Sequence, residues 1–160
     1  MKALDKAIQL RESGHLEEAR SILLELVDQE PMNPSVWYQF AWIHDVMGLE
    51  GAAVPYYKKA LELGLMDKER QGAYLGLGST FRTLGMYNEA QLILDEAIKE
   101  YPDQREFQVF YAMVKFNQKE YKESTEILLK QLAETSNDIG IQTYKKAILF
   151  YSNKLDQIWK

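Results

Sequence analysis

The chain of 160 residues contains no cysteine, only two histidines and only four prolines. The absence of cysteine excludes disulfides and thiolate metal sites. His15 and His44 form neither a His-x3-His pair nor an HExxH motif, so no metal site is predicted. Basic residues are outnumbered, 19 against 24 acidic ones. This balance argues against nucleic-acid binding, because neutralising phosphates requires a basic stripe.

Long hydrophobic runs are also missing. The longest late run, residues 147–151, is far shorter than the roughly 20 residues of a membrane span. Charges at Lys2, Asp5 and Lys6 interrupt the N-terminal region before the apolar core of an export signal can form. No serine or threonine lies in a recognisable nucleophile motif. With ordinary apolar and charged fractions of 46% and 27%, the composition predicts a folded, cytoplasmic, non-catalytic protein without cofactor and without membrane contact.

What the chain does contain is a tandem repeat. Gly14 recurs as Gly48, Gly85 and, with the glycine lost, Lys119, at steps of 34, 37 and 34 residues. Two further series keep the same steps: Ala19, Ala53, Ala90 and Ser124, and Leu23, Tyr57, Leu94 and Leu128. A period near 34 indicates stacked helical pairs, so the fold class is predicted to be all-α. Such arrays leave an extended surface free, which favours a binding scaffold over a catalyst.

The turn glycines and the apolar periodicity predict nine helices. Pro55 would clash with the carbonyl of Gly51, so a late or distorted start is expected for the fourth helix. Asp67 is predicted to be the N-cap of the fifth helix. The nine helices are expected near residues 2–12, 16–29, 34–47, 50–62, 68–84, 87–99, 104–117, 121–134 and 138–158.

The third unit carries the most specific pattern: Tyr74-x2-Leu77-Gly78-x2-Phe81, followed by Gly85, Ala90, Leu94, Ala97 and Pro102. This unit closely resembles the tetratricopeptide repeat signature, and the second unit, with Trp37-x2-Phe40-Ala41-x2-His44, resembles it too. The resemblance implies a single domain over residues 1–160, folded as a right-handed superhelical array of antiparallel helix pairs. The implied repeats cover about residues 1–33, 34–67, 71–104 and 105–137, with a capping helix at about 138–158.

The helix predicted at residues 34–47 has two apolar stripes, and only one of them is needed for repeat packing. In proteins that this chain resembles, the second stripe of each first helix lines a concave groove that holds a peptide or a partner segment. The resemblance thus implies a groove for a protein partner. The predicted groove residues are Tyr38, Trp42, Asp45, Val46, Leu75, Ser79, Arg82, Val109, Met113 and Phe116.

Two alternatives to a free groove stay open at this stage. The same residues could touch only neighbouring helices, or the same apolar surface could join two copies into a homodimer. The carboxylate clamp of chaperone-binding family members is absent, since its positions fall on residues such as Leu4, Ile8 and Gln39. Capture of acidic chaperone tails is therefore not predicted.

Glycines crowd the helix at 68–84, where each interior glycine costs roughly 0.5–1 kcal/mol relative to alanine. Gly78 is explained by repeat packing. Gly72 and Gly76 predict a close approach, either by a neighbouring helix or by a bound segment. At the C-terminus, the stripe Ile141, Tyr144, Ile148, Tyr151 and Leu155 predicts a helix that packs on the fourth repeat, with a partner-binding tail as the alternative.

Overall fold

The computed structural model describes residues 2–160, and these form ten α-helices with no strand among them. The all-α prediction is confirmed, whereas the predicted count of nine is wrong by one helix, for a reason given below. The bounds are α1 Ala3–Glu12, α2 Leu16–Gln29, α3 Pro34–Val46, α4 Glu50–Glu62, α5 Asp67–Thr83, α6 Tyr87–Glu100, α7 Arg105–Asn117, α8 Tyr121–Thr135, α9 Ile139–Thr143 and α10 Lys145–Tyr151.

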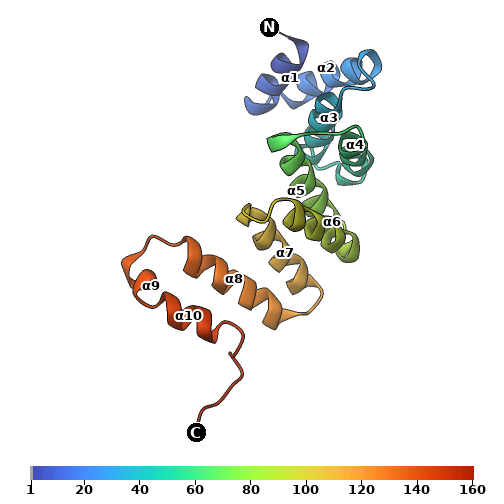
Figure 1. Cartoon of the computed structure of the whole chain (residues 1–160). Coiled ribbons are helices and arrows are strands. Elements are labelled where there is room, and N and C mark those ends of the chain that lie inside the picture. Colours follow the sequence, from blue (N-terminus) through green and yellow to red (C-terminus); the bar gives the residue numbers. More distant parts are fainter. Residues whose placement is uncertain (1) are drawn as a thin grey trace. The chain divides into compact units, whose positions relative to one another are not determined.

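The chain divides into two compact units, residues 1–93 and 94–160, with the boundary inside α6. In the first unit each helix from α1 to α5 packs on the next one (Figure 1). The first helices of successive repeats also touch, α1 against α3 and α3 against α5. Stacked helical hairpins of this kind bury a continuous core between neighbours.

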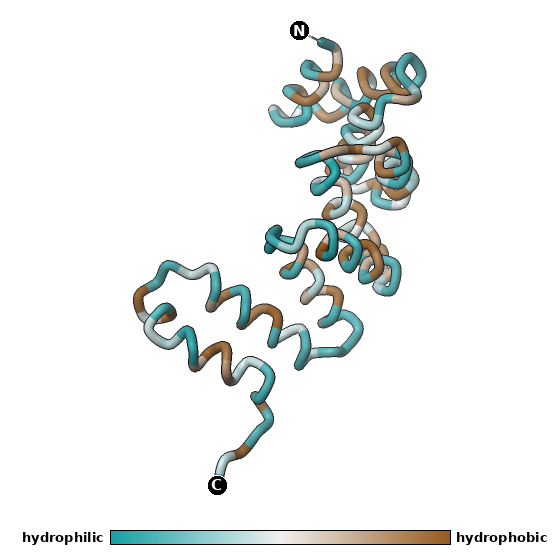
Figure 2. The backbone as a smooth tube through the Cα atoms, in the orientation of Figure 1, coloured by the Kyte–Doolittle hydropathy of each residue, from teal (hydrophilic) through white to brown (hydrophobic). Residues whose placement is uncertain are grey.

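Small and branched apolar side chains fill the core at the start of the first unit. Ala7, Ala19, Val36 and Ile43 have no exposed surface, and Leu23 has 1%. Each lies on the apolar stripe of its helix, as the 3.6-residue period requires. Hydrophobic and hydrophilic stretches follow each other along the helices (Figure 2).

The turn within each helix pair contains a residue in the left-handed backbone conformation. Gly14, Gly48 and Gly85 have φ angles of +84°, +73° and +74°. In each turn, the N–H of the residue after the glycine donates a hydrogen bond to a carbonyl of the preceding helix, for example His15 N to Leu10 O at 2.8 Å. Lys119 occupies the equivalent position in the fourth repeat and adopts φ +66° although it carries a side chain. The turn geometry is thus preserved where the glycine is lost.

Replacing Lys119 with glycine is expected to stabilise the protein by about 0.5–1 kcal/mol. A left-handed conformation costs an L-residue roughly 1–2 kcal/mol, of which the larger backbone entropy of glycine in the unfolded chain cancels a part. Urea unfolding of Lys119→Gly measures the gain. Gly85→Lys is the matched control and should lose a similar amount; a neutral result for both variants would contradict the strain argument.

Two local expectations in the first unit were wrong. Helix α4 begins at Glu50, well before Pro55. Pro55 has no N–H to donate to the carbonyl of Gly51, but Gly51 is exposed, so water can bind that carbonyl instead. Asp67 is the first residue of α5, with φ +50°, and the N-cap is Met66, which makes no side-chain capping bond.

In the second unit, α8 packs between α7 and α10 (Figure 1). Phe107, Ala112, Val114 and Ala133 are fully buried. Ser124, which replaces the alanine of the other repeats, donates its hydroxyl to Ala112 O at 2.7 Å. A polar side chain is therefore tolerated at this core position because its hydrogen bond is satisfied.

The predicted capping helix at 138–158 is broken into α9 and α10. Thr143 bonds back to Ile139 O at 2.8 Å, and Tyr144 leaves helical geometry with ψ 13°. Gly140 weakens the first segment, since glycine is a poor helix former. Helix α10 packs on α8, as predicted. The predicted stripe is only partly covered: Ile141 and Ile148 are half-buried, but Tyr144, Tyr151 and Leu155 are exposed.

Candidate protein-binding surface

Tyr38, the first predicted groove residue, is not open to a partner. Its side chain is 7% exposed, and its ring lies 5.6 Å from that of Trp42 and 6.4 Å from that of Tyr57, measured between centroids. Burial raises the pKa of the Tyr38 hydroxyl to about 12. This part of the predicted groove is filled by the protein's own rings.

The two unexplained glycines of α5 make room for those rings. A Cβ placed on Gly72 would collide with the Tyr38 hydroxyl and lie 2.9 Å from its Cζ. A Cβ on Gly76 would lie 2.5 Å from Cζ of Tyr57. The neighbouring-helix interpretation of these glycines is therefore confirmed.

Trp42 is covered by a residue that the sequence did not single out. The guanidinium carbon of Arg11 on α1 lies 3.5 Å from the centroid of the Trp42 ring, a cation–π contact. The Arg11 side chain is only 8% exposed, and its buried Nε has no hydrogen-bond partner. Burial lowers the pKa of Arg11. Arg11 lies one repeat period of 34 residues before Asp45, which was a predicted groove residue. This repeat spacing is the sequence signal that could have identified Arg11.

Asp45 is held inside a hydrogen-bonded network. Its carboxylate accepts from Tyr57 Oη at 3.1 Å and from Thr80 Oγ1 at 3.0 Å. Burial raises the pKa of Asp45, against the opposing effect of these two hydrogen bonds. Burial and the Asp45 charge also raise the pKa of Tyr57. The network joins α3, α4 and α5, so its first role is to hold these helices together.

The remaining predicted groove residues of the first unit are more accessible. Val46 at the end of α3 is 49% exposed. Leu75, Ser79 and Arg82 on α5 are half-buried. Trp42 and these four residues are the predicted groove positions that a partner could reach in this unit.

In the second unit, Val109, Met113 and Phe116 follow each other at steps of four and three residues along α7. Val109 is half-buried, whereas Met113 and Phe116 are 37% and 59% exposed. The Phe116 ring packs edge-on against Tyr121, at 5.1 Å between centroids. The opposite face of α7, with Phe107 and Val114, is fully buried. Helix α7 thus presents a second, open apolar stripe.

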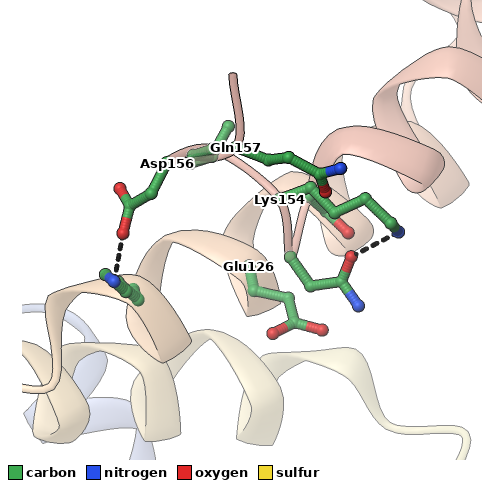
Figure 3. A pocket seen from close by; sticks show the side chains of 8 residues that line it. Glu126, Lys154, Asp156 and Gln157 are labelled. Atoms are coloured by element: carbon green, nitrogen blue, oxygen red, sulfur yellow. Dashed lines mark hydrogen bonds and ion pairs between the residues drawn. The ribbon is translucent and has the colours of Figure 1, made fainter. Parts of the chain in front are cut away.

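Several shallow hollows lie on the surface of residues 2–160. The best-formed one, about 350 Å³, lies between α8 and residues 152–157 (Figure 3). Lys122 and Asp156 form an ion pair there, and Glu126 and Lys154 also line the hollow. Lys154 Nζ donates to Phe150 O at 2.9 Å, within its own segment.

The histidines have structural surroundings. His44 is 3% exposed and donates Nδ1–H to Phe40 O at 2.7 Å, while His15 lies in a turn with Nδ1 3.0 Å from Ser13 Oγ. Across residues 2–160 no three acidic or histidine side chains gather closely enough to hold a metal ion. None of the helices in that range is both long and apolar enough to cross a bilayer.

Comparison with known proteins identifies the family. The model of the tetratrico peptide repeat family matches residues 34–155. The match covers more than half of the chain, and the chain therefore belongs to this family. No curated protein sequence matches it. Proteins with this fold are protein-interaction scaffolds and are generally not enzymes.

Solved structures agree with the fold. The chain is similar to MamA from Desulfovibrio magneticus RS-1, with a TM-score of 0.75, 17% identity, and coverage of 96% of this chain and 86% of that one. It is similar to YrrB, a TPR protein with an unusual peptide-binding site. The TM-score is 0.72 and the identity is 16%, over 95% of this chain and 77% of that one. It is also similar to a chain of the APC/C hetero-tetramer Cut9–Hcn1, with a TM-score of 0.75 and 19% identity. This match covers 92% of this chain but only 29% of that chain's length. These identities show the fold alone.

Proposed function

We propose that this chain is a non-catalytic scaffold that binds a peptide or helix of a partner protein along the predicted groove residues. The observation that carries the proposal is the open stripe of α7, where Met113 and Phe116 are exposed although the opposite face is buried. Phenylalanine and methionine are both enriched at protein interfaces relative to the rest of the surface. The peptide-binding site described for YrrB is consistent with this role.

The two units contribute differently to the proposed binding. In the first unit, Tyr38 and Asp45 serve internal contacts, which leaves Trp42, Val46, Leu75, Ser79 and Arg82 as contact positions. In the second unit, Val109, Met113 and Phe116 provide the apolar anchor. The net charge of −5 supports a protein rather than a nucleic acid as partner.

Phe116→Ala is expected to weaken binding of a cognate peptide at least about 30-fold, because hot-spot residues contribute 2 kcal/mol or more. Random linear peptides selected on the native chain serve as the probe, and titration calorimetry measures their affinities. Trp42→Ala is expected to weaken the same peptides.

Leu92→Ala is the matched control, since Leu92 is 64% exposed on α6 and lies outside the predicted groove residues. Its affinity should equal that of the native chain. The proposal is overturned if no peptide is selected above background, or if Phe116→Ala and Trp42→Ala bind at full strength.

A further inference from the structure

The repeat positions of α8 reveal an incompletely covered helix face. Leu23 and Tyr57 are 1% and 2% exposed, and Leu94 is fully buried. Leu128 occupies the same repeat position but is 42% exposed, and Leu132, one helical turn later, is 46% exposed. In the first unit this position is covered by the first helix of the following repeat, as Gly76 of α5 covers Tyr57. Helix α10, which packs on α8, is too short to do the same.

An aromatic cluster lies on α10 and the segment after it. The rings of Phe150, Tyr151 and Trp159 contact each other at centroid distances between 5.1 and 6.5 Å. All three stay about half exposed, at 52%, 48% and 53%. An exposed ion pair joins Lys122 of α8 to Asp156 of the segment that carries Trp159 (Figure 3). The three rings are in contact with one another and stay open to solvent.

Together, these side chains offer an area suited to an interface. Large aromatic residues bury about 150–250 Å² each, and aliphatic ones somewhat less. The exposed apolar residues of α8 to the C-terminus therefore leave roughly 500–900 Å², comparable to the ~800 Å² that each partner buries in a standard interface. Apart from Tyr121, which contacts Phe116 of α7, the residues are Leu128, Leu132, Ile139, Tyr144, Phe150, Tyr151, Leu155, Ile158 and Trp159. We call this set the C-terminal apolar surface.

The charges around this surface select its partner. Residues 121–160 contain six lysines and five acidic residues, so they are nearly neutral. Several of these charges are already paired within the chain, such as Lys130 with Glu126 at 2.6 Å and Glu134 with Arg105 at 2.6 Å. A strongly charged partner would find no complement here. Two copies of this surface, by contrast, can meet without repulsion.

A head-to-tail contact fits poorly. The exposed residues of α1 are mostly polar, namely Asp5, Lys6, Gln9 and Glu12. Burying them against the C-terminal apolar surface would strand polar groups. We therefore infer that the C-terminal apolar surface joins two copies of this chain in a two-fold symmetric dimer, with the same surface on both sides. This dimer is independent of the proposed partner-binding residues.

The test is the mass in solution across a wide concentration range. Light scattering of the native chain is expected to give twice the chain mass of 18.6 kDa, and Trp159→Glu is expected to give the single mass. Leu92→Glu is the matched control, since it adds the same charge at an exposed leucine of the first unit. It should remain dimeric. Phe116→Glu should also remain dimeric, which separates this surface from the proposed partner-binding residues.

A second readout guards against misfolding of Trp159→Glu. In a Trp37→Phe, Trp42→Phe background, Trp159 is the sole tryptophan, since the chain has three. Its fluorescence emission should shift to the blue as the concentration rises, because dimerisation removes the ring from water. A native monomer at all concentrations, or a dimer unaffected by Trp159→Glu, overturns the inference. A dimer that Phe116→Glu abolishes instead assigns self-association to the α7 stripe and overturns it as well.

Discussion

Lys115→Glu is expected to lower the free energy of unfolding by about 3–5 kcal/mol, the usual cost of an uncompensated buried charge. Lys115 is 6% exposed at a core position that holds His44 and Phe81 in the preceding repeats. Its Nζ lies 3.5 Å from a carboxylate oxygen of Glu120 and 3.3 Å from one of Glu123. A glutamate there would replace the buried cation by a third carboxylate beside those of Glu120 and Glu123.

The native lysine is charged in spite of its burial. Burial lowers the pKa of Lys115, but Tyr111, Glu123 and Glu120 raise it by more, so the net shift is upward. Lys115→Met should therefore be neutral or stabilising, because it fills the same volume without a buried charge and leaves both glutamates partly in water. Urea unfolding of the two variants tests this pair of expectations.

Lys146→Glu is the matched control for the charge reversal, because Lys146 is exposed on α10. Exposed substitutions usually change stability by less than about 0.5 kcal/mol. If Lys115→Glu were as mild as Lys146→Glu, the salt-bridged lysine would be a surface group in solution and the packing described for α7 would be wrong.

Gly76→Ala is expected to destabilise the protein by about 1–2 kcal/mol, although the same change in an open helix stabilises. Alanine favours a helix over glycine by about 1 kcal/mol. Overpacking a filled site costs about 1–3 kcal/mol, and the new Cβ would lie 2.5 Å from Cζ of Tyr57. The packing cost is expected to exceed the propensity gain, and thermal or urea unfolding measures the balance.

Two companion variants isolate the cause. Gly51 lies on the exposed side of α4, and a Cβ added to it would meet no atom within 4 Å, so Gly51→Ala should stabilise by roughly 0.5–1 kcal/mol. Tyr57→Leu places in the second repeat the residue found at Leu23 and Leu94, and should make Gly76→Ala tolerable. Equal gains for Gly76→Ala and Gly51→Ala would show that the Tyr57 ring does not pack against α5.

The repeat spacing was enough to predict most helices and their turns. Glycines at fixed steps mark left-handed closures, and their φ angles of +73° to +84° confirm this at Gly14, Gly48 and Gly85. The spacing could not predict the break at Tyr144, because this residue lies in the last segment, outside the repeated positions. It also could not show that α4 tolerates Pro55, since that depends on solvent reaching Gly51.

The candidate site was less predictable than the fold. On α3, Tyr38 proved to be buried against Gly72 of α5, and the ring of Trp42 to be covered on one side by Arg11. The stripe on α7 has the same pattern in sequence and yet is open at Phe116. Sequence periodicity places a residue on a helix face, but it does not tell which other side chain reaches that face.

The sequence by itself determined the family, the helical pairs and the absence of thiol chemistry, because these depend on residue types and on spacing along one chain. Only the tertiary structure decided which apolar residues remain exposed. Exposure depends on side chains that arrive from distant positions, as Arg11 does at Trp42, or that fail to arrive, as at Leu128. The surfaces available for binding are therefore a property of the packed helices and not of any one repeat.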